Sequence, residues 1–158
     1  MSQKLFTQAR QVVALAIVGS AEIAAFVAEE FPGKTIKVYR EVLKENPPPA
    51  ENCPFVAFGP FTHAQMDKDP HRIEHAMPMG VFVSKSNDYT EAGGVYVVES
   101  VEVLEELAAL VEQVASAALL AAGYAFEQDP FLSDDDLWDE YSGSFYLYRV
   151  RTTRRINL

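Results

Sequence analysis

The chain has 158 residues, of which 49% are hydrophobic and 11% aromatic, enough to bury one globular core. Its 23 acidic and 13 basic residues give a formal net charge of -10, which argues against general nucleic-acid binding, because phosphate contacts need a surplus of Lys and Arg. Cys53 is the single cysteine, which excludes an intrachain disulfide and a zinc site of four cysteines, so a reducing compartment fits best.

Two helical segments are predicted at the start of the chain. Ser2 can cap the first, and apolar residues recur at helical spacing over residues 5–17. Gly19-Ser20 is a predicted break, after which Ser20 can cap a second segment that ends at Pro32-Gly33. Polar and acidic residues interrupt the stretch 11–31, so neither a secretion signal nor a membrane span is expected.

Short strands are predicted in the middle of the chain. Thr35–Leu43 alternates apolar and charged residues, which favours a half-buried strand, with a short helix as the alternative. Prolines 47–49 predict an extended spacer, because proline fixes φ and lacks an amide proton. Phe55–Phe58 and Gly80–Ser84 are apolar runs of strand length. Val95–Val98 is a further strand, antiparallel to the preceding run if the segment between them is a hairpin loop.

The last third contains the strongest helix pattern. Ser100–Tyr124 combines a capping serine, acidic residues in the first turn and Gly123 as a stop signal. Glu127–Glu140 holds seven acidic residues and is too negative to be buried throughout. Phe145–Val150 predicts a closing strand.

These elements predict an α+β fold in one domain over residues 1–158. We expect a small mixed or antiparallel sheet of about four to five strands, packed against the N-terminal helix and the long helix near residues 100–124. An irregular excursion is predicted at about 62–78, and an arginine-rich end at 149–158.

One stretch matches a catalytic pattern. His71-Arg72-Ile73-Glu74-His75 fits H-x-x-E-H, in which two histidines one helical turn apart bind zinc and the glutamate acts as base. That mechanism needs a stable helix and a third ligand, whereas Pro70 and Pro78 leave room for about one and a half turns. We therefore expect no metal, no cofactor and no catalytic residue. A zinc hydrolase built on His71, Glu74 and His75 is the alternative.

A charge asymmetry closes the chain. The acidic segment 127–140 is followed by four arginines between Arg149 and Arg155. The two stretches either pair within one monomer, or one subunit's basic tail meets its neighbour's acidic segment in a closed ring. The second arrangement predicts salt-sensitive assembly.

The order of these parts resembles the tail terminator proteins of long-tailed bacteriophages, also called tail-completion or head-tail joining proteins. The resemblance is carried by an N-terminal helix, PFVAFGPF from Pro54, a polar excursion, GVFV from Gly80, a further strand, a long helix and a closing aromatic strand. The tri-proline spacer and the acidic segment Asp134–Glu140 have no place in the family pattern.

The resemblance implies a virion protein, assembled in the host cytoplasm, without enzymatic activity. It would form a hexameric ring on the last ring of the tail tube, stop tube polymerisation, and join the tail to neck or head-completion proteins. DNA would only pass through the channel, which an acidic surface suits, and no membrane is involved.

Protein contacts are expected in the excursion and in the charged stretches near the C-terminus. The predicted contact residues are His63, Asp67, Asp69, His71, Arg72, His75, Asp134, Asp135, Asp136, Arg151, Arg154 and Arg155. Besides the zinc hydrolase, the alternatives are a head-completion or other neck protein and an acidic inhibitor or immunity-type binding module.

Overall fold

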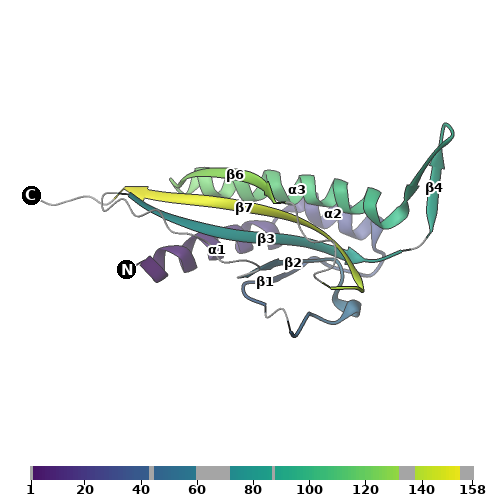
Figure 1. The fold of residues 1–158 in the computed structure, drawn as a ribbon, viewed down its shortest axis with the longest axis horizontal. Helices are drawn as coiled ribbons and strands as arrows, with labels where there is room; N and C mark the ends of the chain where they lie inside the picture. The colour runs from purple at the N-terminus through teal and green to yellow at the C-terminus, as the bar shows by residue number, and fades with distance from the viewer. Residues whose placement is uncertain (1, 43–44, 60–71, 87, 132–137, 154–158) are drawn as a thin grey trace, which may run out of the picture.

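The structure, a computed structural model, describes residues 2–42, 45–59, 72–86, 88–131 and 138–153 (Figure 1). Within these ranges the helices are α1 (Ser2–Val18), α2 (Ala21–Glu30), the 3-10 turn η1 (Ala50–Asn52) and α3 (Glu99–Ala121). The strands are β1 (Lys37–Tyr39), β2 (Phe55–Phe58), β3 (Arg72–Ser84), β4 (Tyr89–Ala92), β5 (Val95–Val98), β6 (Ala125–Phe131) and β7 (Tyr141–Thr153). The predicted α+β class is confirmed.

The described strands form a five-stranded sheet in the order β1-β2-β3-β7-β6, and a separate pair, β4-β5. β1 and β2 are parallel, and the other neighbours in the main sheet are antiparallel. β3 and β7 are each 13 residues long and pair along their whole length, so they form the long central ribbon of the sheet (Figure 1).

All three α-helices cover the same face of the sheet. Their apolar sides meet strand residues of alternating position, as expected for a half-covered sheet. The buried residues of this helix-side core are Ala9, Val13, Ile17, Ile23, Val27, Val56, Phe58, Met77, Met79, Val81, Val83, Leu104, Leu107, Ala108, Val111, Ala115, Leu119, Tyr148 and Val150.

The capping signals explain where the helices begin and end. Ser20 is the N-cap of α2, and its Oγ accepts the amide of Ile23 at 3.3 Å, as predicted. α3 ends in a Schellman motif, in which Gly123 has φ +84° and its amide donates to the Leu120 carbonyl at 3.0 Å. The Tyr124 amide donates to the Leu119 carbonyl at 3.0 Å.

An aromatic cluster lies on the opposite face, near the start of β7. Its buried members are Val42, Cys53, Phe55, Ala57, Phe82, Trp138, Tyr141 and Phe145. The ring of Phe82 lies 5.0 Å from that of Phe55 and 4.9 Å from that of Trp138, between ring centroids. Burial raises the pKa of Tyr141 to about 12, because desolvation disfavours the phenolate.

The tri-proline spacer packs against this cluster. Pro48 is buried, and its carbonyl accepts a hydrogen bond from the Tyr141 hydroxyl. The spacer is extended at Pro49, as predicted, and then turns through η1 into β2. Pro48 therefore ties the spacer to the aromatic cluster, which gives this segment a structural role.

The excursion predicted for 62–78 is wrong over its last part. Residues 72–78 belong to β3, and Pro78 lies inside the strand opposite Leu147. The pairing of β3 with β2 ends at Met79, which lies opposite Phe58. Pro78 is one position beyond that end, so there β3 has a described partner on one side only, β7. Proline is tolerated in such an edge position, because no ladder hydrogen bond is needed there.

The pairing expected for Val95–Val98 is also wrong. This segment pairs with Tyr89–Ala92 through the two-residue turn Gly93-Gly94, and not with Gly80–Ser84, whose partners are β2 and β7. Likewise Ser100 is not the helix cap. Val98 occupies the N-cap position of α3, while Ser100 is buried with its Oγ 3.3 Å from Ser142 Oγ.

No single described helix is long and apolar enough to cross a bilayer. Gln8–Val18 and α2 meet the criterion together across a 57° bend, by length and composition only. In this structure both helices contribute buried residues to the helix-side core, and core helices often pass the same test.

Candidate functional site

The hairpin β4-β5 stands apart from the main sheet and projects from one end of the molecule (Figure 1). Gly93 and Gly94 have φ of +59° and +82°, the positive values that a two-residue turn of type I′ requires. Glu91 Oε1 accepts the Gly94 amide at 2.7 Å and closes the turn. The tip is therefore a defined structure rather than a loose loop.

The base of the hairpin is tied to the first turns of α3. The Glu99 amide donates to the Asp88 carbonyl at 2.9 Å, and Thr90 Oγ1 donates to Glu102 Oε2 at 2.8 Å. These bonds fix the direction in which the hairpin leaves the body.

The hairpin leaves large side chains in solvent. The register places Tyr89 opposite Val98 and Tyr96 opposite Glu91, so both tyrosines lie on one face. Tyr89 is 68% exposed and Tyr96 69%, and Val95 on the other face is 63% exposed. Tyrosine combines a large apolar ring with a polar hydroxyl, and it is enriched where proteins bind one another.

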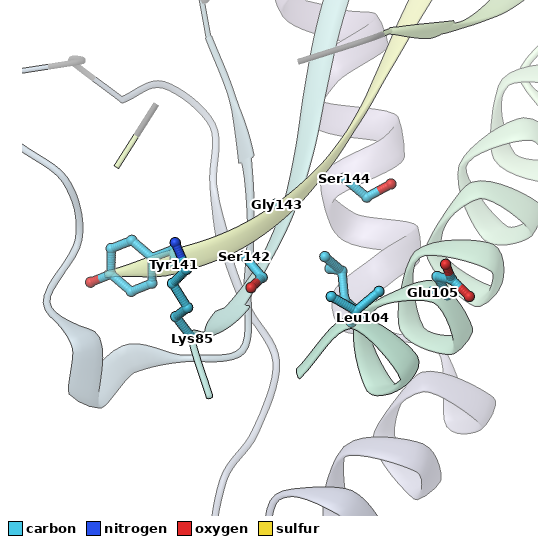
Figure 2. A pocket seen from close by; sticks show the side chains of 8 residues that line it. Lys85, Leu104, Glu105, Tyr141, Ser142, Gly143 and Ser144 are labelled. Atoms are coloured by element: carbon cyan, nitrogen blue, oxygen red, sulfur yellow. The ribbon is translucent and has the colours of Figure 1, made fainter. Parts of the chain in front are cut away.

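Two hollows flank the start of α3 at the base of the hairpin. The larger, about 400 Å³, lies between α3 and the beginning of β7 (Figure 2). It is lined by Lys85, Val101, Leu104, Glu105, Tyr141, Ser142, Gly143 and Ser144. The smaller, about 190 Å³, is lined from α2, β3 and α3, including Phe31, Val83 and Ser100. Both hollows therefore lie next to the base of the hairpin.

The larger hollow is lined by charged groups and hydroxyls. Lys85 and Glu105 are its charged groups, and Ser142 and Ser144 contribute hydroxyls, whereas the Tyr141 hydroxyl bonds the Pro48 carbonyl. Its lining includes no histidine or cysteine to activate a hydroxyl nucleophile. Within the described ranges, no group of three or more His, Cys, Asp or Glu residues is placed to hold a metal ion.

The hairpin end is strongly acidic. Between residues 85 and 106 the chain has six acids and one lysine. The acids Asp88, Glu91, Glu99, Glu102, Glu105 and Glu106 are all exposed. We call this surface, residues 85–106, the acidic hairpin end.

Most of the predicted contact residues lie outside the described residues: His63, Asp67, Asp69, His71, Asp134, Asp135, Asp136, Arg154 and Arg155. Arg72 and His75 fall in β3, at register positions opposite Thr153 and Val150. Their role in protein contacts stays a prediction.

The described part of the HRIEH stretch, residues 72–75, is a strand and not the helix that the zinc hydrolase alternative needs. Ile73, Glu74 and His75 form part of strand β3. Residues four apart in a strand are separated by about 13 Å, compared with about 6 Å in a helix. The described part of the motif therefore lacks the spacing by which one helical turn brings two histidines to a metal.

Pairing of acids and arginines within the monomer is confirmed for two arginines. Arg149 Nη2 lies 2.5 Å from Asp129 Oδ2, and Arg151 Nη2 lies 2.6 Å from Glu127 Oε1. These pairs join β6 to β7, and they explain how a segment predicted to be an acidic exposed stretch begins as a strand. Arg151 already forms an ion pair with Glu127 in the monomer, and its role in contacts with a partner remains a prediction.

The tyrosines of the hairpin were missed as site residues. Their sequence signal was Gly93-Gly94 between two short runs, YTEA and VYVV, which is a hairpin pattern. Their exposure follows only from the separation of the hairpin from the main sheet.

No protein-family model and no curated protein matches the sequence.

Proposed function

We propose that this chain is a structural subunit that forms a ring at the head-proximal end of a phage tail. There it ends polymerisation of the tail tube and joins the tail to the neck or head, as tail terminator proteins do. Its partners are further copies of itself, the tail tube protein and the neck or head-completion proteins. It carries no enzymatic activity and no cofactor.

The observation that carries this proposal is the exposed hairpin. Tyr89, Val95 and Tyr96 are each more than 60% exposed on an element that lies outside the main sheet. An isolated two-stranded hairpin is marginally stable in water, and this one buries neither tyrosine. A projecting, aromatic hairpin with a rigid base is what a subunit needs to hold a neighbour.

Charge supports the same proposal. The net charge of -10 disfavours adhesion to DNA phosphates. A ring made from such subunits lets DNA pass without binding it. The observed α+β fold also agrees with the fold that the resemblance to tail terminators implies.

One other function draws support from a specific observation. The acidic hairpin end with its two tyrosines is also suited to a single basic partner, as in an inhibitor or immunity-type binding module. Such a module acts as a monomer in a one-to-one complex, whereas the proposed ring needs several copies.

Electron microscopy of tails assembled without this chain tests the proposed function. We expect tubes of irregular, extended length that fail to join heads, because nothing ends polymerisation. Restoring the wild-type chain returns normal tails, and the Tyr89→Ser, Tyr96→Ser double variant does so much less well. Leu120→Ser, which changes an exposed side chain on α3 outside the hairpin, is the matched control and restores them fully. Tails of normal length and head attachment without the chain would refute the proposal.

A further inference from the structure

The edge of the sheet at β1 is basic, in contrast to the acidic hairpin end. Residues 34–41 contain Lys34, Lys37 and Arg40 against one acid, Glu41. All three basic side chains are exposed, and β1 is a terminal strand of the described sheet. We call Lys34, Lys37 and Arg40 the basic edge.

The charges of the basic edge are bonded to neutral oxygens. Lys34 Nζ donates to the Glu51 carbonyl at 2.6 Å, and Lys37 Nζ donates to Asn52 Oδ1 at 2.8 Å. Arg40 Nη1 donates to Gln11 Oε1 at 3.1 Å. Within the described residues none of the three forms a salt bridge, so their positive charge stays available to an acidic partner.

An apolar strip on α1 adjoins the basic edge. Gln11 holds Arg40, and Leu15 and Val18 follow Gln11 at spacings of four and seven residues, on the same side of the helix. Leu15 is 62% exposed and Val18 58%. The surface therefore offers apolar area beside its cations.

The acidic hairpin end has the complementary composition. It presents exposed carboxylates together with two exposed tyrosines. Its carboxylates are complementary to the cations of the basic edge, and its aromatic rings to the aliphatic side chains of the α1 strip. The hairpin projects from one end of the molecule and points away from β1, which lies near the middle of the long axis (Figure 1).

We propose that the acidic hairpin end of one copy docks on the basic edge and α1 strip of the next copy. Because the two surfaces differ, the contact is head-to-tail, and each bound copy leaves one free surface of each kind. Repetition of such a contact closes into a ring or extends into a filament. This inference rests on the proposed function for its ring and identifies the contact that builds it.

Opposite charges at this contact make assembly dependent on salt. The Debye length falls from about 10 Å at 0.1 M to about 3 Å at 1 M ionic strength. We expect the assembled fraction to fall as salt is raised. The tyrosines and the α1 strip keep a residual affinity, because apolar burial is not screened.

Two variants that disable opposite sides of the contact test the inference. The edge variant carries Lys37→Glu and Arg40→Glu, and the hairpin variant carries Tyr89→Ser and Tyr96→Ser. All four side chains are exposed, and the hydrogen bonds that Lys37 and Arg40 lose are exposed as well. Circular dichroism and thermal unfolding should therefore show that both variants are folded. Should the edge variant fail to fold, Lys34→Glu replaces it.

Sedimentation at low salt is the measurement. We expect wild-type protein to form multimers and each variant to lose association by about 10-fold or more. An equimolar mixture of the two variants should give two-chain species and nothing larger, because one intact hairpin meets one intact edge. Leu120→Ser, at an exposed position on α3 outside both surfaces, is the control and should leave assembly intact.

The outcomes separate this inference from the proposed function. Variants that assemble like wild type, a mixture that stays monomeric, or a wild-type chain that never associates at low salt would each overturn the head-to-tail contact. The comparison of tails made with and without the chain is independent of them, because a terminator can assemble through other surfaces.

Discussion

Replacing Phe82 by alanine is expected to lower the free energy of unfolding by about 3–5 kcal/mol. The Phe82 side chain is 1% exposed and lies among Phe55, Trp138 and Phe145 in the aromatic cluster. Truncation removes this buried ring and leaves a cavity that rigid aromatic neighbours cannot fill.

The sheet beneath the ring makes the loss larger. Phe82 pairs across the ladder with Gly143, and Phe145 pairs with Gly80, so each ring lies over a glycine that has no side chain. A Cβ on Gly80 would come within 2.6 Å of the Phe82 ring, and one on Gly143 within 2.9 Å. The glycines create the space and the phenylalanines fill it, so removal of Phe82 exposes bare backbone.

Urea unfolding followed by circular dichroism measures the effect. Tyr96→Ala removes an aromatic ring of similar size from an exposed position, and its free energy of unfolding should stay within about 0.5 kcal/mol of wild type. A loss below about 1 kcal/mol for Phe82→Ala would contradict the packing described for this cluster.

Leu107→Ala is the second large effect, at about 2–5 kcal/mol. Leu107 is 0% exposed and lies in the helix-side core between α3 and the sheet. Loss of the Leu107 side chain weakens the helix-side core, and it also weakens the packing of α3, to which the base of the hairpin is bonded.

Leu120 on the same helix provides the matched control. It is 66% exposed, so Leu120→Ala makes the same chemical change at almost no cost, within about 0.5 kcal/mol. Equal effects at the two positions, measured by urea unfolding, would show that α3 does not pack on the sheet by the Leu107 face.

Local patterns predicted most of the elements. Helical spacing and the Gly19-Ser20 break gave α1 and α2, and Gly123 gave the end of α3. Apolar runs gave β2 and the inner part of β7. In each case the signal lies within the element, because it depends on burial of one face or on a cap.

Pairing between distant segments was harder to predict. β6 looked like an acidic loop because its partners Arg149 and Arg151 come about 20 residues later and neutralise Asp129 and Glu127 only in the folded sheet. Pro78 looked like a strand breaker, although β3 runs through it where β2 has ended. Neither fact is visible in local periodicity.

The candidate site was predicted least well. Charge-rich stretches drew attention to the excursion and the C-terminal arginines, whereas the exposed tyrosines lie in an ordinary strand pattern. Alternating apolar residues predict a half-buried strand. Tyr89 and Tyr96 are exposed because the β4-β5 hairpin lies outside the main sheet.

Native mass measurement of the purified chain, alone and with isolated tail tubes, tests the ring most directly. The account predicts a closed species of about six times the 17.6 kDa chain mass, formed in solution at low salt or on tube ends. A chain that stays monomeric under both conditions and does not bind tubes would contradict it.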